Sequence, residues 1–316
     1  MPAVNDRISK TDYNNIRDKV ASVLGTSLTS NATYGYGQVL QSTQVSESNR
    51  ITVNHIANLR YDIINAWVHL YGSAPALVSV ADGDTIRYNL TTAPVDQFDT
   101  FANAIVASRF STPHSSQRIT VNKGSTATSW PGIYGSAWSS LATCTISATF
   151  SSAEKARAFF NSGGTISFTS SQSGGSVTNQ NTSWRNLLSS VGQQSWGGNT
   201  PGSGTSPADG NNFYRCSNVF NLWYTASASS PYGSNSYRVF ARTPFVANNS
   251  TGTANVIEFK IEFVDGHVGN SGGPDFVDGT FQVAVETLEA FGVLQPITAG
   301  NFTIESPVLA LGPVIS

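Results

Sequence analysis

Charged side chains are scarce in this sequence. Lysine, arginine, aspartate and glutamate make up 11% of its 316 residues, whereas an ordinary soluble domain contains roughly 25%. The 17 basic and 19 acidic residues nearly balance, so the formal net charge is only −2. A chain with so little charge has no general electrostatic attraction for nucleic acid or for an anionic membrane surface. We therefore expect neither of them as a partner.

Cysteine and long apolar runs are also nearly missing. Cys144 and Cys216 are the only cysteines, which excludes a disulfide framework and a zinc site built on Cys-x-x-Cys pairs. We interpret both as small buried apolar residues, and whether they lie close together stays open. No run approaches the ~18 apolar residues of a membrane span, and the first residues, MPAVNDRISK, lack the apolar segment of a secretory signal. The sequence predicts a protein made in the cytoplasm that leaves it, if at all, by a route without a signal.

What the sequence does contain is a repeat near its N-terminus. The stretch RISKTDYNNIRDKV from Arg7 aligns with RITVNHIANLRYDI from Arg50 at an offset of 43 residues. Thr11 and Asn54 are good N-cap residues, so each copy predicts a short extended stretch followed by a helix. Apolar residues then recur three or four apart, which places them on one helix face; they are Tyr13, Ile16, Val20 and Leu24, and in the second copy Ile56, Leu59, Ile63, Trp67 and Leu70.

Two interpretations of this repeat remain open. The simpler one is a pair of helices that pack on each other with pseudo-symmetry. The other is a docking module for a neighbouring subunit. Arg17 and Arg60 recur at the same phase and would pair with acidic groups across such a contact, although ordinary solvated arginines fit equally well. The residues expected to make contact in the docking interpretation are Tyr13, Ile16, Arg17, Ile56, Leu59 and Arg60.

The rest of the chain is rich in strand patterns. From Ser139 on, TCTISATF, TISFTSS, VIEFKIEFVD and TFQVAVETL all alternate between apolar and polar residues. Strands with one buried and one wet face indicate antiparallel sheets, most simply a sandwich. We therefore predict a mainly β (α+β) fold with a few short helices, in three parts. These are an N-terminal two-helix repeat module over 1–75, a mixed connecting region over 76–138 and an antiparallel β-sandwich-like domain over 139–316.

A possible catalytic motif occurs in HVGNSGGPDF, which begins at His267. Its Gly-Asn-Ser-Gly-Gly-Pro resembles the nucleophile loop of trypsin-like and HtrA-like serine proteases, and would make Ser271 the nucleophile. That chemistry needs a base and a third group to orient the base, and none of the candidate bases His55, His69 and His114 has the context of that family. Strongly alternating segments flank the loop, so the pattern predicts a β-hairpin with Ser271 in its turn. We expect no enzymatic activity.

No cofactor or metal site is predicted either. The aspartates in turns lack the spacing of an EF-hand, and aspartate needs no metal to be favoured in a turn; they are Asp82, Asp84, Asp265, Asp275 and Asp278. No phosphate-binding glycine loop follows a strand and opens a helix.

Three tryptophans carry the remaining hypothesis of binding. Trp130, Trp138 and Trp196 lie in aromatic or glycine-rich stretches predicted as loops, where such rings stack on sugars. Anchors buried at a subunit interface explain them equally well.

Five stretches carry a resemblance to known proteins. They are ARAFFNSGGTISFTSSQSGG, NTSWRNLLSSVG, SNSYRVFAR, FKIEFVDGHVGNSGGPDFVDGTFQVAVETLEAF and, near the N-terminus, ITVNHIANLRYDIINAWVHLYG. They are similar to virion structural proteins of tailed bacteriophages, especially those of marine cyanophages. The resemblance implies a non-enzymatic tail component (fibre, baseplate or neck) made in the host cytoplasm and carried in the virion. It implies other virion proteins as partners and a homo-oligomer, as a trimer or ring.

Two alternatives stay open beside this expectation. One is a receptor- or carbohydrate-binding module of a tail fibre, with a host surface glycan as its partner. The other is a capsid decoration or head-completion protein.

Overall fold

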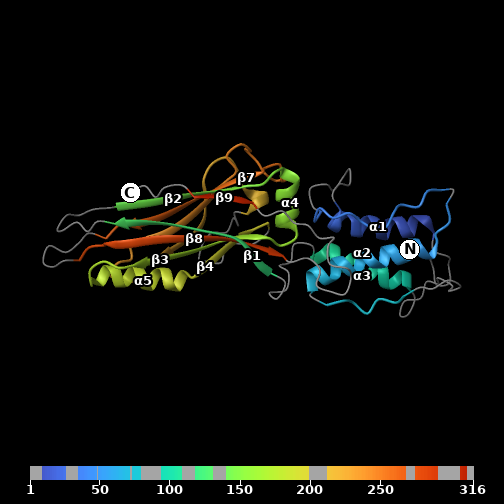
Figure 1. Cartoon of the computed structure of the whole chain (residues 1–316), viewed down its shortest axis with the longest axis horizontal. Coiled ribbons are helices and arrows are strands. Elements are labelled where there is room, and N and C mark those ends of the chain that lie inside the picture. Colours follow the sequence, from blue (N-terminus) through green and yellow to red (C-terminus); the bar gives the residue numbers. More distant parts are fainter. Residues whose placement is uncertain are drawn as a thin grey trace. The chain divides into compact units, whose positions relative to one another are not determined.

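A computed structural model of the chain describes residues 9–25, 35–47, 49–71, 73–79, 94–108, 118–130, 140–198, 212–267, 275–290 and 307–311. The chain divides into two compact units (Figure 1). The helical unit comprises Met1–Ile119, Arg157–Gly163 and Glu289–Glu305, and the β unit comprises Thr120–Ala156, Gly164–Leu288 and Ser306–Ser316. The structure thus has two units where the sequence predicted three consecutive parts, and a segment from the middle of the chain belongs to the helical one.

Three helices form the body of the helical unit. They are α1 (Lys10–Leu24), α2 (Val53–Tyr71) and α3 (Pro94–Ser108), and each of them contacts the other two. The sequence assigned α3 to a connecting region, but it packs as a full member of this unit. Helix α2 is buried on nearly every side from Asp62 to Leu70, as expected for the central helix of a small unit.

Helix α1 starts with a reciprocal cap. The Ser9 hydroxyl accepts a hydrogen bond from the Asp12 amide at 3.2 Å, and the Asp12 carboxylate accepts one from the Ser9 amide at 3.1 Å. This pairing satisfies two of the amides that a helix start leaves open. The prediction that Thr11 caps α1 is therefore wrong, because the residue three positions before Asp12 takes that role.

The start of α2 is built in the same way. The Thr52 hydroxyl accepts from the His55 amide at 3.4 Å, and the Nδ1 atom of His55 accepts from the Thr52 amide at 3.1 Å. Asn54, the predicted cap, lies inside the helix instead. Thr52 and His55 lie 43 residues after Ser9 and Asp12. The aligned positions therefore form the same reciprocal hydrogen bonds at the helix start with different side chains.

The β unit contains two sheets. The four-stranded sheet has the order β1–β8–β3–β4, and the five-stranded sheet has the order β5–β6–β7–β2–β9. All pairings whose register is described are antiparallel. The bounds are β1 Arg118–Trp130, β2 Ser140–Thr149, β3 Thr165–Ser173, β4 Gln193–Gly197, β5 Asn221–Ser227, β6 Ser236–Arg242, β7 Val256–Asp265, β8 Gly279–Ala290 and β9 Val308–Leu311; the helices are α4 Ala153–Asn161 and α5 Asn179–Val191, with a 3-10 turn, η2, over Phe213–Arg215.

Strands β7 and β8 do not form the predicted hairpin. Strand β7 pairs with β2 and β6 in the five-stranded sheet, whereas β8 pairs with β3 in the other sheet. The prediction is wrong because alternation shows which face of a strand is buried but not which neighbour supplies its hydrogen bonds. The segment between them therefore runs from one sheet to the other, and Ser271 lies outside the described residues.

Aromatic side chains from both sheets meet in one core. The ring of Phe259 on β7 lies 4.8 Å from that of Phe168 on β3 and 5.0 Å from that of Trp196 on β4. On α5, Trp184 lies 5.3 Å from Phe281 on β8. The fold is α+β, which confirms that part of the prediction, but helix and strand occur in comparable amounts, so the chain is not mainly β.

Candidate functional site

The apolar residues expected at a docking contact are inside the helical unit. Tyr13 and Leu59 are 0% exposed, Ile56 is 1% exposed and Ile16 is 3% exposed. All four belong to one core cluster with side chains of α3 and of residues 35–47. The structure therefore places them in the core of their own unit and not on a face open to another subunit.

The two arginines of the repeat have different partners within the chain. Nη1 of Arg17 lies 3.1 Å from the Asp18 carboxylate. Arg60 donates from Nε and Nη2 to the carbonyl of Leu77, at 3.2 and 3.0 Å. Arg17 and Arg60 occupy aligned positions of the repeat, but they do not make equivalent contacts. Both bind groups of this same chain.

A buried carboxylate lies beside Arg17. Asp62, on α2, is 1% exposed. Its oxygens accept hydrogen bonds from the Ser42 hydroxyl at 2.6 Å, the Ser42 amide at 2.8 Å and the Gln41 amide at 3.0 Å. Burial raises the pKa of Asp62, although the hydrogen bonds and the Arg17 charge oppose the shift. Asp62 therefore anchors the irregular segment 35–47 to the central helix.

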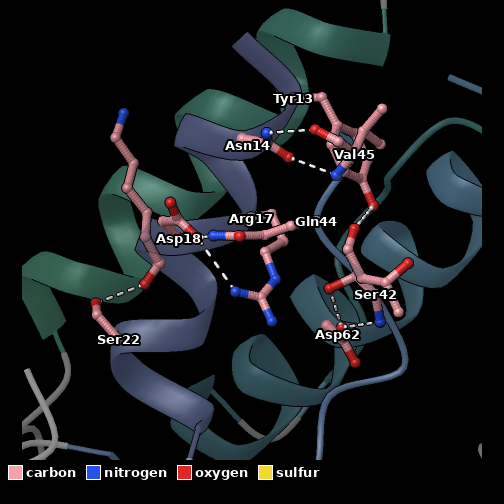
Figure 2. A network of polar contacts seen from close by, with 11 residues as sticks. Tyr13, Asn14, Arg17, Asp18, Ser22, Ser42, Gln44, Val45 and Asp62 are labelled. Atoms are coloured by element: carbon pink, nitrogen blue, oxygen red, sulfur yellow. Dashed lines mark hydrogen bonds and ion pairs between the residues drawn. The ribbon is translucent and has the colours of Figure 1, made fainter. Parts of the chain in front are cut away.

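Helix α1 binds the same segment further along (Figure 2). The Asn14 side chain donates to the Val45 carbonyl and accepts from the Val45 amide, both at 3.0 Å, and so replaces the pairing that a strand would give. Gln44 donates to Asp18 at 3.2 Å. Such a network satisfies backbone groups that have no secondary-structure partner, and we interpret it as scaffolding and not as a reactive centre.

His69 connects α2 to Arg157–Gly163, the segment from the middle of the chain that belongs to the helical unit. One ring nitrogen, Nε2, lies 2.7 Å from the Ser162 carbonyl, and the Tyr36 ring lies 4.8 Å away. Burial lowers the pKa of His69 to about 4. The ring is therefore neutral at pH 7 and donates from Nε2, which makes His69 a structural histidine.

A second cluster of ionisable groups occurs where β7 ends. Asp265 is 3% exposed and accepts a hydrogen bond from Gln180 on α5 at 2.5 Å. Burial raises the pKa of Asp265 to about 6, with a smaller contribution from the nearby Asp275. The Tyr232 hydroxyl donates to Asp275 at 2.6 Å, and Nε2 of His267 lies 3.9 Å from the same carboxylate.

His267 and Asp275 flank the segment that contains Ser271. A histidine beside a carboxylate is the arrangement that orients a general base. Sequence reasoning missed this histidine because the order His267, Ser271, Asp275 is not the His-Asp-Ser order of the trypsin-like family. Within the described residues this cluster joins α5, the connection between β5 and β6 (residues 228–235) and both ends of the segment that leads from β7 to β8. Its hydrogen bonds hold these pieces together.

Asp278 has a separate structural role. Its carboxylate accepts from the Ser176 amide at 2.9 Å and the Ser176 hydroxyl at 2.8 Å, and also from the Asn181 side chain. Burial opposes ionisation, but these hydrogen bonds outweigh it and lower the pKa of Asp278. The turn before α5 is thereby fixed to the start of β8. No group of three His, Cys, Asp or Glu side chains that could hold a metal ion occurs in the part of the chain that the structure describes.

The structure also places the other residues singled out in the sequence. Trp196 is 0% exposed and packs in the aromatic core, so its ring is not available to a sugar. The side chain of Trp130 and all of Trp138 lie outside the described residues. Cys144 and Cys216 are free and buried, and burial raises the pKa of their thiols to about 11 and about 12.

Comparison with known proteins does not identify a family for this chain. None of the described helices is long and apolar enough to cross a membrane. No protein-family model, no curated protein and no solved structure matches the chain.

Proposed function

We propose that this chain is a non-enzymatic structural subunit of a tailed-phage virion, located in the tail as a fibre, baseplate or neck component. One observation carries the proposal. The stretches whose sequences resemble virion proteins are scattered along the chain, but most of them are neighbours in the β unit. A resemblance that covers one cooperatively packed unit is stronger support than the same number of isolated motifs.

The pairing of these stretches can be followed strand by strand. The stretch ARAFFNSGGTISFTSSQSGG contains β3. This strand pairs with β8, which belongs to the stretch that begins FKIEFVDG. SNSYRVFAR supplies β6, which pairs with β7 from that same stretch. NTSWRNLLSSVG forms most of α5, which packs on β3.

We extend the proposal to the finer architecture. The β unit is a β-sandwich, since rings from both sheets meet in one core. The N-terminal helices are two copies of one module, since their caps use aligned positions.

Such a subunit acts by assembly. Its partners are other virion proteins and further copies of itself in a trimer or ring. The outer face of the five-stranded sheet already pairs its own charges, with Arg242 2.6 Å from Glu258 and Lys260 2.7 Å from Glu262. Contacts made by so neutral a surface depend little on Coulomb attraction and will tolerate changes of salt.

The proposal is tested by mass spectrometry of phage particles, purified from a lysate of cells in which the gene for this chain is expressed. We expect peptides of this chain at a copy number matching a tail component. Their absence from intact particles would contradict it. Labelling of wild-type protein by a fluorophosphonate probe, lost in Ser271→Ala, would show a serine hydrolase instead.

A further inference from the structure

An open groove of about 420 Å³ lies in the β unit, between α5 and the connection from β5 to β6. Ligand sites of proteins typically have volumes of about 300–1,000 Å³. The lining consists of the run 227–232 and of six residues of α5, namely Asn179, Thr182, Ser183, Asn186, Leu187 and Ser190. None of these twelve residues carries a charge at pH 7, although the groove lies open to solvent.

One wall is a single stripe of α5. Its six residues, from Asn179 to Ser190, are spaced three, one, three, one and three apart, so they share one helix face. The opposite face of the helix carries Trp184 and Leu188, which are buried in the core. Because that face is fixed by packing, the polar stripe is held in one orientation.

The other wall is fixed by hydrogen bonds. Ala228 and Asn235 are bonded through their backbones at 2.9 Å, and the Tyr232 amide donates to the Ser229 carbonyl at 2.9 Å. The Tyr232 hydroxyl donates to Asp275 at 2.6 Å. Both walls are therefore formed before any ligand arrives, which reduces the entropy cost of binding.

The chemistry of the lining is amphipathic. Within the described residues, the side chains of Asn179, Ser183, Asn186, Ser229 and Ser230 form no hydrogen bond to protein. Their hydroxyls and amides both donate and accept. Ala228 and Pro231 supply apolar surface between them, and Leu187 and Tyr232, which are 5% and 7% exposed, add only a small edge each.

We propose that this groove binds a neutral, polyhydroxylated ligand, namely a sugar or short oligosaccharide. A sugar ring presents hydroxyls that both donate and accept around its edge and carbon-bound hydrogens on its faces, which matches this mixture. An anionic ligand would meet no cation in the lining, and a cation would meet no carboxylate. The inference goes beyond the proposed role in assembly. It does not depend on that role, because the groove is formed entirely by residues of this chain's β unit.

Saturation-transfer NMR on the full chain tests the inference. The probes are D-glucose, D-galactose, D-mannose and N-acetyl-D-glucosamine, each at about 10 mM, so that a dissociation constant of about 1 mM is detected. We expect transfer to at least one of them and little to gluconate, an acidic relative of glucose. No transfer to any neutral sugar, or equal transfer to gluconate, would overturn the proposal.

Two variants of α5 make the test specific. Ser183→Tyr fills the groove, and Ser189→Tyr places the same side chain on an exposed position of the same helix outside it. We expect Ser183→Tyr to weaken transfer about fivefold or more, and Ser189→Tyr to leave it unchanged. Asn186→Ala, which adds no bulk, should also weaken it. Equal signals in all three variants would place the sugar elsewhere and overturn the proposal.

Discussion

The helical unit and the β unit both bury polar and aromatic side chains, but in different settings. Around α2, the buried residues include the carboxylate of Asp62, the imidazole of His69 and the amide of Asn65. In the β unit, the largest fully buried side chains are rings such as Trp184, Trp223 and Phe259, and the polar groups of Asp265 and Asn181 are buried there as well.

The two settings differ in how backbone groups are satisfied. Segment 35–47 has no strand partner along most of its length, so side chains of α1 and α2 supply its hydrogen bonds. Strands β3 and β7 each pair regularly with a neighbour in their own sheet, β8 and β6 respectively, so most of their backbone groups need no side-chain partner. We therefore expect the helical unit to respond most to changes in polar groups, and the β unit to changes in apolar volume.

The largest effect is expected from Phe259→Ala. Phe259 is 0% exposed and contacts rings of the other sheet, so its loss leaves a cavity and should cost about 3–5 kcal/mol of stability. Hydrogen exchange read by mass spectrometry should show faster exchange in peptides of β3, β6 and β7 and little change in α1. Phe259→Leu, which keeps most of the volume, is the control. An equal increase of hydrogen exchange in both units would contradict the expectation that this loss of apolar volume disturbs mainly the β unit.

The next effect is a dependence on pH in the helical unit. The pKa of His69 is about 4 when folded, against 6.5 ordinarily, so between these values the unfolded chain binds a proton that the folded unit does not. Stability is therefore lost as the pH falls through this window, by at most about 3 kcal/mol at 1.36 kcal/mol per pKa unit. Urea unfolding at pH 7 and at pH 4.5 should show a smaller loss in His69→Gln than in the wild type. The same loss in both would contradict the assignment.

The β unit should show the opposite sign at Asp265. Its pKa is about 6 when folded, against 3.8 ordinarily, so the folded unit binds a proton more tightly between these values. Stability contributed by this group rises as the pH falls from 6 to 4, by at most about 3 kcal/mol. The Asp265→Asn variant should gain less than the wild type from the same change of pH. A variant that gains as much would show that Asp265 is ionised normally.

A smaller effect is expected from Asp62→Ala, which leaves two amides and one hydroxyl of Gln41 and Ser42 without their acceptor. We expect a loss of about 2 kcal/mol, with faster hydrogen exchange concentrated in residues 35–47. Asp62→Asn keeps one acceptor oxygen and should fall between the wild type and Asp62→Ala. Unchanged exchange in that segment would show that Asp62 does not anchor it.

The smallest effect concerns the two helix caps. Ser9→Ala and Thr52→Ala should each cost about 1 kcal/mol, because each removes the acceptor for an amide of the first turn. Thermal unfolding of the two variants and of the double variant should give additive losses. If Thr52→Ala costs nothing, the two helix starts are not equivalent.

Local patterns in the sequence predicted part of this structure. The spacing of Tyr13, Ile16 and Val20 predicted a buried helix face, and the alternation in β7 predicted which of its side chains face the core. These features depend on residues that are close in the chain. The cross-sheet path from β7 to β8 depends on distant partners, and no local pattern contains that information.

The candidate sites were harder to predict for a related reason. His267 and Asp275 come together with Tyr232 only because the chain crosses between sheets next to the β5 to β6 connection. The groove beside α5 was missed because a polar stripe on a helix is ordinarily its solvent face. A signal was present in the run of Ser-Ala-Ser-Ser-Pro opposite it, but the sequence does not show that the two are neighbours.

The proposed role in the virion is tested most directly by immunogold electron microscopy of purified particles, with antibodies raised against the folded chain. We predict gold at the tail of intact particles, at a fixed position that identifies fibre, baseplate or neck. Particles that carry no gold, while the free protein is labelled in the same lysate, would contradict the proposal.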